Sequence, residues 1–450
     1  MNDYISNRTI HTHDVGTYVT HGGAHPVQIV SALGRSILDS RGFPTVQVDL
    51  ELADGTLVSG AAPAGASTGA HEAVELRDGG AAFGGKGVRK AAEMVTTEIS
   101  DLLTSRPWAG ISEIDRALAD LDGTPNWSRL GANAVVATSI AASRALAREA
   151  GLSLHRWIAL LSGANESLPV PHFNVLNGGA HAANDLDFQE FMIAPVGATS
   201  EEEAVQTGAE VYHALKALVQ TRYGTAGLGD EGGFAPAISS PEDALDLIVQ
   251  AITDAGHRAA LDDVAIALDP AANGFGDGDG RYRVAGQDLD RAALADRYGA
   301  LLDAYPIRSI EDAFHEDDHD GWALMASRFG GRVQLVGDDL YVTDPERIAE
   351  GAEKGWSDAV LIKPNQIGSV SQTLDAIATA RSHGMACMVS HRSGETTDTF
   401  IADLVVGTGV GQIKSGAPAR GERVCKYNRL TDIEADQPGL PYGLSTKDDA

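Results

Sequence analysis

The chain has 450 residues, of which 43% are hydrophobic, so it can bury a sizeable core and has room for two or three domains. Its 63 acidic residues outnumber 34 basic ones, and the formal net charge of −29 argues against binding to nucleic acid or to an anionic membrane. No run of about 18 apolar residues and no signal-peptide pattern is present, so we expect no membrane span. The only two cysteines, Cys387 and Cys425, suit a reducing compartment, and we expect a cytoplasmic protein.

The N-terminal third of the chain changes character twice. Residues 1–28 are polar and aperiodic, a composition that predicts a disordered extension. Apolar and polar residues alternate over 45–52 as in a half-buried strand, and residues 53–56 predict a hairpin turn into a second strand. Helical patterns follow over residues 87–103 and 133–150. We therefore predict a small α+β domain over residues 29–163.

The remainder, residues 164–450, has a different rhythm in which short apolar runs each end at a charged or polar residue. The runs recur at intervals close to the roughly 30 residues of a strand–helix–strand unit. The residues that end them are Asp269, Glu311, Asp338, Lys363, His391 and Lys414. Repeated units of this kind predict parallel strands joined by right-handed helical crossovers.

A β/α barrel carries its catalytic residues at the carboxyl ends of successive strands, which is the pattern just described. A doubly wound open sheet also gathers ligands at its strand ends and is the alternative. Six such ends that converge on one chemistry favour the closed barrel. The predicted fold class is therefore α/β, with a C-terminal β/α barrel and an N-terminal α+β domain.

The strand-end residues divide into two chemical groups. The carboxylates are oxygen donors that suit a hard divalent cation such as Mg²⁺, and the others are cationic or hydrogen-bond donors. Such a cluster predicts a positive site within an acidic protein, suited to an anionic, phosphorylated substrate. Lys363 would lie beside the metal, where its charged form is disfavoured, and is therefore a candidate general base.

Two acidic segments could supply an acid partner for this base. Glu231 lies within the glycine-flanked segment 229–233, and Gln189 and Glu190 lie between two phenylalanines. A metal, a base and a carboxylic acid together can remove a proton next to a carboxylate and expel a leaving group. Surface loops with ordinary charges would not explain the regular spacing.

The residues resemble the enolase (phosphopyruvate hydratase) family over about residues 29–430. The shared segments occur in the family's order, and they cover residues 37–42, 65–69, 174–179, 229–233, 337–340, 365–368, 390–396 and 411–414. The resemblance implies an enolase-type TIM barrel and a lyase. The implied reaction is the reversible, Mg²⁺-dependent dehydration of 2-phospho-D-glycerate to phosphoenolpyruvate in glycolysis. It also implies a small phosphorylated carboxylic acid as the ligand, and a homodimer or higher homo-oligomer.

The resemblance also implies two Mg²⁺ ions in each active site. Asp269, Glu311 and Asp338 would hold one ion, which clamps the substrate carboxylate. Ser67 would ligate the second ion, which bridges the phosphate. Ser67 lies in the glycine-rich segment 65–69, a composition that suits a mobile lid.

The remaining roles are implied in the same way. Lys363 would abstract the proton, and Glu231, supported by Glu190, would protonate the departing hydroxyl. The residues expected to bind or line the substrate are Gln189, His181, His391, Arg392, Ser393, Lys414 and Ser67.

Some positions depart from the family's usual residues, among them Phe43, Ala64, Pro270 and Ala313. A divergent enolase accounts for them. An enolase-like paralogue of secondary metabolism accounts for them equally well; it would act on a related phospho- or phosphono-acid, as carboxyphosphonoenolpyruvate synthase does. A non-catalytic protein on this scaffold is disfavoured, because no catalytic group has been lost.

Three further sequence features resemble functional motifs, and we expect none of them to have a catalytic or binding role. Residues 80–87 nearly spell a P-loop, but Gly87 replaces the hydroxyl residue and no strand precedes it. His315 and His319 have zincin spacing but lack the apolar helix face of that motif. Cys387 lies in an apolar strand and is expected in the core.

Overall fold

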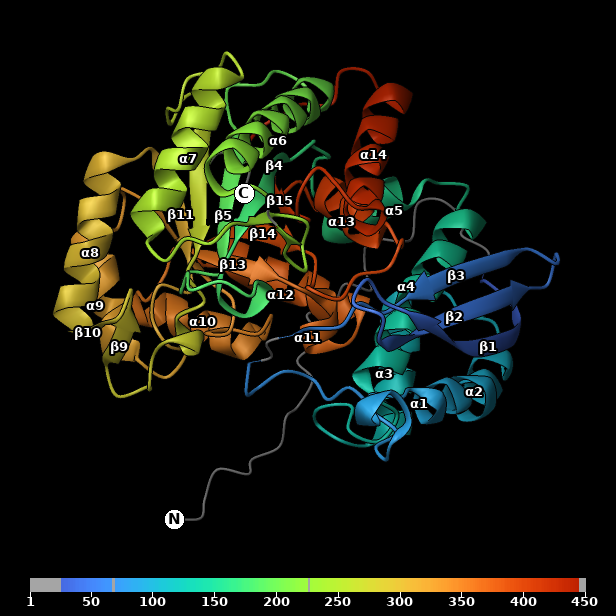
Figure 1. The fold of residues 1–450 in the computed structure, drawn as a ribbon. Coiled ribbons are helices and arrows are strands. Elements are labelled where there is room, and N and C mark those ends of the chain that lie inside the picture. The colour runs from blue at the N-terminus through green and yellow to red at the C-terminus, as the bar shows by residue number, and fades with distance from the viewer. Residues whose placement is uncertain (1–25, 67–68, 226, 445–450) are drawn as a thin grey trace.

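The computed structural model describes residues 26–66, 69–225 and 227–444, which form the two adjoining parts seen in Figure 1. The N-terminal part contains a three-stranded antiparallel sheet in the order β1-β2-β3. Its strands are β1 (Ile29–Leu38), β2 (Pro44–Leu52) and β3 (Leu57–Ala61). The strand predicted over 45–52 and the turn that follows it are therefore confirmed.

Helical segments follow this sheet along the chain, and some of them pack against it. They are α1 (Arg89–Met94), a π-helical segment (Val95–Ile99), α2 (Ser100–Thr104), α3 (Ile111–Asp122), α4 (Ala132–Glu149) and α5 (Leu154–Ser162). The helix predicted over 87–103 is present but is widened at its centre by the π-helical segment. The helix predicted over 133–150 is α4, an alanine-rich helix that is buried along most of its length and lies against β2 and β3.

The C-terminal part is a closed barrel. Within the described residues, eight strands form the ring, and pairing of the last with the first closes it. They are β4 (Val170–Asn177), β5 (Glu190–Pro195), β8 (Val264–Asp269), β11 (Ile307–Glu311), β12 (Gln334–Gly337), β13 (Ala359–Ile362), β14 (Ala386–Ser390) and β15 (Gln412–Lys414). All six strands predicted from the apolar runs are present, and the closed barrel rather than the open sheet is confirmed.

The barrel is not wholly parallel, although repeated β-α units predicted parallel strands. β5 runs antiparallel to both neighbours, β4 and β8. The connection from β4 to β5 contains only a short 3-10 turn (Gly179–His181) and no crossover helix, so the chain reverses direction. A short hairpin, β6 (Gly227–Leu228) and β7 (Phe234–Ala235), extends the sheet beside β4.

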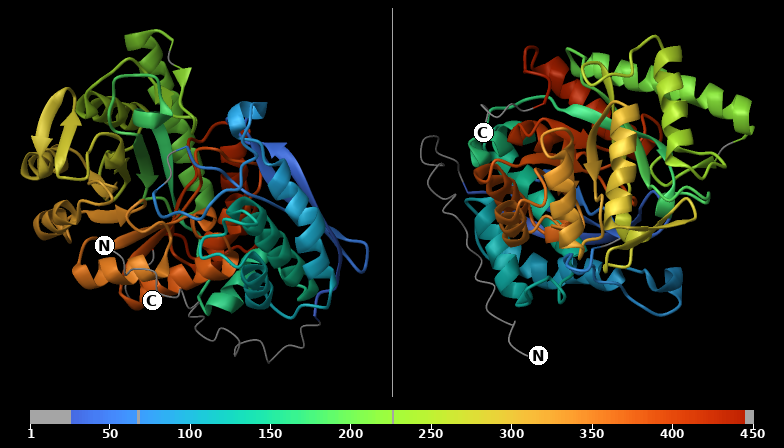
Figure 2. Two further views of the ribbon diagram at one scale, coloured as in Figure 1. Left: turned by 90° about the horizontal axis from the view of Figure 1, so that it is seen from below. Right: turned by 90° about the vertical axis from the view of Figure 1, so that its left-hand side faces the viewer.

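Helices surround the strands, as both views of Figure 2 show. They are α6 (Glu201–Tyr223), α7 (Pro241–Asp254), α8 (Arg291–Ala304), α9 (His319–Phe329), α10 (Pro345–Lys354), α11 (Pro364–Ile367), α12 (Val370–Ser382), α13 (Phe400–Thr408) and α14 (Gly421–Asp436). Many begin at a side-chain cap that accepts a backbone N–H, namely Ser200, Ser240, Asp290, Asp318, Asp344 and Ser369. A hairpin of β9 (Arg281–Val284) and β10 (Gln287–Asp290) precedes α8. Among the described residues, no helix is both long and apolar enough to cross a bilayer.

Specific polar contacts join the two parts along α11, α12 and the start of α13. The indole N–H of Trp127 donates to the carbonyl of Ile367 at 2.9 Å. Arg144 makes a bidentate ion pair with Asp398, with both N···O distances 2.7 Å. These contacts fix the position of the N-terminal part beside the barrel.

Several expectations concern segments near the chain's ends and the short motifs. The predicted extension lies outside the described residues except for its last three; one of these, Val27, pairs with Trp108. The segment that resembles a P-loop forms a short 3-10 turn (Ala82–Gly85) that no strand precedes. His315 precedes α9 and His319 begins it, so the two histidines do not share a helix. Cys387 is buried in β14, as expected.

Gly60 of β3 lies directly against the backbone of α4. A Cβ at Gly60 would lie 2.4 Å from the carbonyl oxygen of Ala137 and 2.7 Å from the amide nitrogen of Ala141, both backbone atoms. We expect Gly60→Ala to destabilise the protein by about 1–3 kcal/mol, because helix and sheet must separate. The midpoint of urea unfolding would measure the change. Gly421→Ala is the matched control, since a Cβ there meets nothing within 4 Å, and equal midpoints for the two variants would contradict the expectation.

Candidate active site

A narrow cavity of about 20 Å³ opens at the rim of the barrel where the parallel strands end. Its walls are formed by His181, Gln189, Glu190, Glu231, Asp269, Asp338, Lys363, Ser390, His391, Arg392, Ser393 and Lys414. The structure therefore brings together every predicted site residue that it describes, with Glu311 in contact through Lys414. Ser67 lies outside the described residues, so the structure does not place it.

The fold explains why these side chains meet. Asp269, Glu311 and Lys414 are the last residues of β8, β11 and β15, and the residues that follow the other parallel strands lie at the same rim. Glu190 reaches this rim in a different way. It is the first residue of the antiparallel strand β5, so the start of that strand is paired with Asp269 at the end of β8.

Lys414 lies at the centre of a group of buried carboxylates. Its Nζ is 2.8 Å from Glu311, 3.3 Å from Asp269 and 3.3 Å from Glu190. Burial opposes the charged amine, but these three carboxylates outweigh it and raise the pKa of Lys414 well above its ordinary value. Burial and the neighbouring acids also raise the pKa of Glu190 and of Glu311 well above theirs. In this group, the single positive charge of Lys414 compensates the buried carboxyl groups of Glu190, Asp269 and Glu311.

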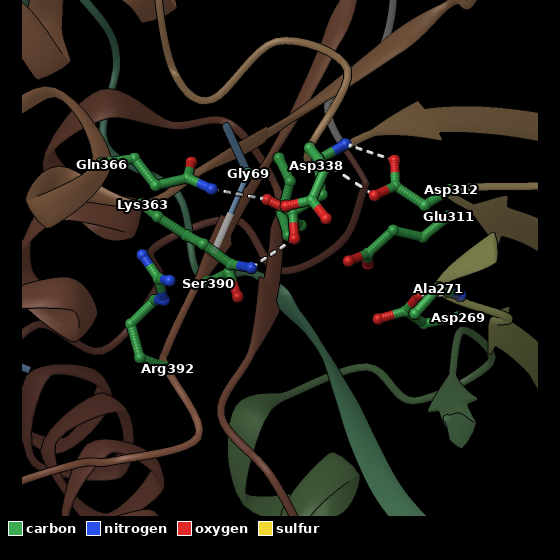
Figure 3. Close-up of polar contacts among 12 residues, drawn as sticks. Gly69, Asp269, Ala271, Glu311, Asp312, Asp338, Lys363, Gln366, Ser390 and Arg392 are labelled. Atoms are coloured by element: carbon green, nitrogen blue, oxygen red, sulfur yellow. Dashed lines mark hydrogen bonds and ion pairs between the residues drawn. The ribbon is translucent and has the colours of Figure 1, made fainter. Parts of the chain in front are cut away.

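Asp338 is the centre of a second set of contacts, drawn in Figure 3. It forms an ion pair with Lys363, and it accepts a hydrogen bond from the side chain of Gln366 at 2.9 Å. Its own backbone N–H donates to Asp312 at 2.8 Å, which fixes the start of the loop after β12. Asp338 outweighs burial and raises the pKa of Lys363, so the lysine in this arrangement is an ammonium ion. Figure 3 also shows Asp269 and Glu311 directed toward the same space as Asp338.

The acid candidates form a third group with two histidines. One ligand atom each of His181, Glu190 and Glu231 lie within 4.8 Å of one another. Glu231 accepts a hydrogen bond from Asn174 of β4 at 2.8 Å, and its Oε2 lies 3.4 Å from His391 Nε2. Burial lowers the pKa of His391 to about 3, so its ring is neutral. Burial and Glu231 raise the pKa of Glu190 well above its ordinary value, whereas His391 and His181 outweigh burial and lower the pKa of Glu231 well below it. The proton that this carboxyl pair retains therefore lies on Glu190.

Arg392 is held by an acid that the sequence did not single out. Its guanidinium makes two hydrogen bonds to Glu72, at 2.9 and 3.1 Å, and a third to the side chain of Asn365 at 3.1 Å. Glu72 also accepts the backbone N–H of Gly69 at 3.1 Å and so belongs to the segment that follows the predicted lid. Near the start of that predicted lid, the backbone N–H of Ala66 donates to the hydroxyl of Ser393 at 2.7 Å. The loop from the N-terminal part is therefore fastened to the phosphate-binding candidates at both ends.

Further polar residues around the site were also missed from the sequence. They are Asn174, Asn365, Gln366 and Asp312, all buried and all bonded to a predicted site residue. Asn174, Asn365 and Gln366 lie within segments that resemble the enolase family. The sequence therefore held a signal for these three but gave no role for them.

The barrel rim is rich in the oxygen donors that a divalent cation requires. Among the described residues, ligand atoms lie within 4.8 Å of one another in two groups, His181 with Glu190 and Glu231, and Asp312 with Asp338 and Asp339. The predicted set of three strand-end carboxylates is more widely spaced than these. Asp269, Glu311 and Asp338 come from successive strands, are at least 92% shielded from solvent, and face one space. Buried carboxylates need a compensating cation, and acidic oxygens are the donors that hard divalent cations prefer. In this arrangement Lys414 and Lys363 supply the positive charge.

Fold and site together define a β/α barrel with buried carboxylates and amines gathered at the carboxyl rim of its strands. Residues 29–158 match the family profile described as "Enolase, N-terminal domain", and residues 165–439 match the profile described as "Enolase, C-terminal TIM barrel domain". The chain belongs to the enolase family. Family membership implies use of a divalent metal, in agreement with the carboxylates just described.

We expect a divalent cation to raise the thermal unfolding midpoint, and to do so more at about pH 8 than at about pH 5. Glu190 and Glu311 have raised folded-state pKa values, so without a cation their contribution to stability is complete below their ordinary value of 4.5 and is lost as the pH rises. A bound cation requires ionised carboxylates, so its stabilising effect increases over the same range. Circular dichroism melts in EDTA and in MgCl₂ would measure the difference. An equal shift at both pH values, or a full shift in Asp338→Asn, would contradict this expectation.

Proposed function

We propose that this protein catalyses the reversible, Mg²⁺-dependent dehydration of 2-phospho-D-glycerate to phosphoenolpyruvate. The observation that carries the proposal is one buried cavity lined by a lysine, a glutamate pair, strand-end carboxylates and an arginine. Those are the groups needed to remove a proton next to a carboxylate, to protonate a leaving hydroxyl and to bind a phosphate. In this proposal Asp269, Glu311 and Asp338 hold a Mg²⁺ ion. The bound ion supplies Lewis-acid stabilisation for the negative charge that develops on the substrate carboxylate.

Lys363 is the proposed general base. An amine must be neutral to accept a proton, whereas the ion pair with Asp338 keeps Lys363 charged. When Asp338 shares its charge with a metal ion, less of that charge acts on Lys363, and the lysine pKa falls toward the value that proton abstraction requires. Asp338 would thus couple the binding of a metal ion to the protonation state of Lys363.

Glu231 and Glu190 are the proposed acid pair. The pair retains a proton on Glu190, whose pKa is raised by burial and by Glu231, and the two carboxyl groups are close enough for Glu231 to take up that proton and donate it to a departing hydroxyl. Asn174 holds Glu231 in place from the adjacent strand. After the proton is transferred, the carboxylate that remains is next to Lys414, which is 3.3 Å from Glu190 and stabilises its charge.

The anionic ends of the substrate are assigned to the two cationic sides of the cavity. Arg392 and Ser393 would bind the phosphate, since a guanidinium matches phosphate oxygens in a bidentate geometry. Lys414 and Gln189 would contact the carboxylate end. His181 and His391 line the cavity between these groups and the acid pair.

The first experiment is to mix the purified protein with 2-phosphoglycerate and MgCl₂ and to follow the ultraviolet absorbance of the enol phosphate, with an EDTA control. A metal-dependent rise at the turnover of a metabolic enzyme supports the proposal. A flat trace from folded protein contradicts it, and indicates that the same apparatus acts on another phospho- or phosphono-acid.

We expect Lys363→Ala to lower kcat by about 100- to 10,000-fold, because the base is removed. Exchange of the substrate's α-proton with solvent deuterium, followed by NMR, should fall in parallel. Lys354→Ala is the control, since Lys354 is an exposed lysine at the end of α10. Near-normal exchange in Lys363→Ala would remove this residue from the abstraction step.

Glu231→Gln should separate the two halves of the reaction. The amide cannot donate a proton to the hydroxyl, so dehydration should fall by about 100-fold or more, while α-proton exchange by Lys363 continues. Both rates can be measured in one deuterated sample. If exchange and dehydration fall together, Glu231 acts in the abstraction step instead.

A further inference from the structure

Arg423, in the first turn of α14, is a fully buried cation directly behind the active-site cavity. Its exposed fraction is 0%, and it does not line the cavity. The nearest acid in the described residues is Glu422, whose Oε1 lies 3.3 Å from Nε. Burial of a guanidinium costs free energy unless its N–H groups form hydrogen bonds. The hydrogen-bond partners of Arg423 therefore indicate its structural role.

Those contacts converge on the segments that carry the site. Nη1 donates to the carbonyl of Arg392 at 2.7 Å and to Nδ1 of His391. Nη2 donates to the carbonyl of Ser393 at 2.7 Å and to that of Asp230 at 3.1 Å. One side chain therefore joins the loop after β14, which carries the phosphate-binding candidates, to the residue before the acid Glu231.

The same guanidinium reaches the N-terminal part of the chain. Nη2 lies 3.3 Å from the hydroxyl of Ser40, which itself donates to the carbonyl of Ser393 at 3.3 Å. The backbone N–H of Glu395 donates to that hydroxyl at 3.1 Å. The loop after β14 is thus hydrogen-bonded on two sides, to Arg423 of α14 and to Ser40 in the segment that follows β1.

The contact with His391 determines which imidazole nitrogen carries the proton. An arginine has no acceptor and is not deprotonated in proteins, so its N–H must be the donor in this contact. His391 Nδ1 is therefore the acceptor and has no hydrogen. The single proton of the neutral ring lies on Nε2, the nitrogen 3.4 Å from Glu231 Oε2.

We propose that Arg423 is a positioning residue that fixes His391 as the neutral Nε2–H tautomer facing Glu231. The other tautomer would direct a lone pair at the Glu231 carboxylate and an N–H at the guanidinium, and both contacts would be repulsive. A doubly protonated ring would place two cations against each other in a dry interior. Arg423 thereby keeps the Nε2–H of His391 directed at Glu231 Oε2, which is 3.4 Å away. Among the described residues this N–H has no hydrogen-bond partner, so it is free to donate when a carboxylate oxygen or a ligand comes closer.

The tautomer follows from the contacts alone, whereas its consequence for turnover rests on the proposed function. A histidine in the wrong tautomer cannot donate to Glu231, so protonation of the leaving hydroxyl would be impaired while proton abstraction by Lys363 would not. The effect on the reaction should therefore fall on dehydration rather than on α-proton exchange.

The test is ¹⁵N NMR of the full-length protein labelled at histidine, with His391 assigned by the signals lost in His391→Gln. In the unsubstituted protein we expect a pyridine-type Nδ1 and a pyrrole-type Nε2 that persist from neutral to mildly acidic pH. Arg423→Lys keeps a charge but cannot span the four acceptors, and should give a tautomer mixture. Arg429→Lys is the matched control on the same helix, since Arg429 pairs with Asp403 away from the site.

A protonated Nδ1 in the unsubstituted protein would overturn the proposal, and that measurement does not depend on any variant folding. An unchanged Nε2–H tautomer in folded Arg423→Lys would overturn it as well. In turnover assays, Arg423→Lys should lose about 10- to 100-fold in dehydration with α-proton exchange largely kept, a split that general loss of structure would not give. If the protein does not dehydrate 2-phosphoglycerate at all, the NMR result still decides the tautomer.

Discussion

The structure depends on compensation of negative charge buried at the rim of the barrel. Glu190, Asp269, Glu311 and Asp338 all lie within this rim with little exposure, in a chain whose net charge is already −29. Carboxylates in such a place are stable only when protonated, paired or bound to a cation. Lys414 and Lys363 provide the pairing, and in doing so place two amines beside the carboxylates that a metal ion would also require. The same charged side chains therefore stabilise the folded barrel and form the proposed catalytic site.

The barrel's topology makes this concentration of charge possible. Parallel strands bring their ends to one rim, and the reversed strand β5 adds its first residue to the same rim, so an acid from the start of a strand joins acids from the ends of others. The N-terminal part reaches this rim through Ser40, whose hydroxyl donates to the carbonyl of Ser393. All the described residues that line the cavity belong to the barrel, and the N-terminal part supports them from outside, since Glu72 and Ala66 hydrogen-bond to Arg392 and Ser393.

Much of the fold could be predicted because the strands carry their own signal. The apolar runs that lead into Asp269, Glu311 and Asp338 are short, regularly spaced and interrupted by helical segments, and all three became barrel strands. The direction of β5 could not be predicted, since an apolar run reads the same way for either orientation. The π-helical widening near Val95 likewise has no signature in the pattern.

The membership of the site was more predictable than its internal pairing. Strand ends and family segments located the charged residues, but the position of Lys414 among three acids depends on side chains from four strands. Glu72 and Arg423 were missed for a related reason. Both are ordinary charged residues in their local sequence and become significant only through partners far along the chain, Arg392 in one case and His391 in the other.

The pair between Glu72 and Arg392 means that the anion position is not vacant before a ligand arrives. A phosphate that binds Arg392 has to exchange with, or share, a carboxylate that already holds it in two hydrogen bonds. The measured affinity is then a difference between two ion pairs of the same kind. Added salt weakens both in similar measure, so the ionic-strength dependence of binding should be shallow for so highly charged a ligand.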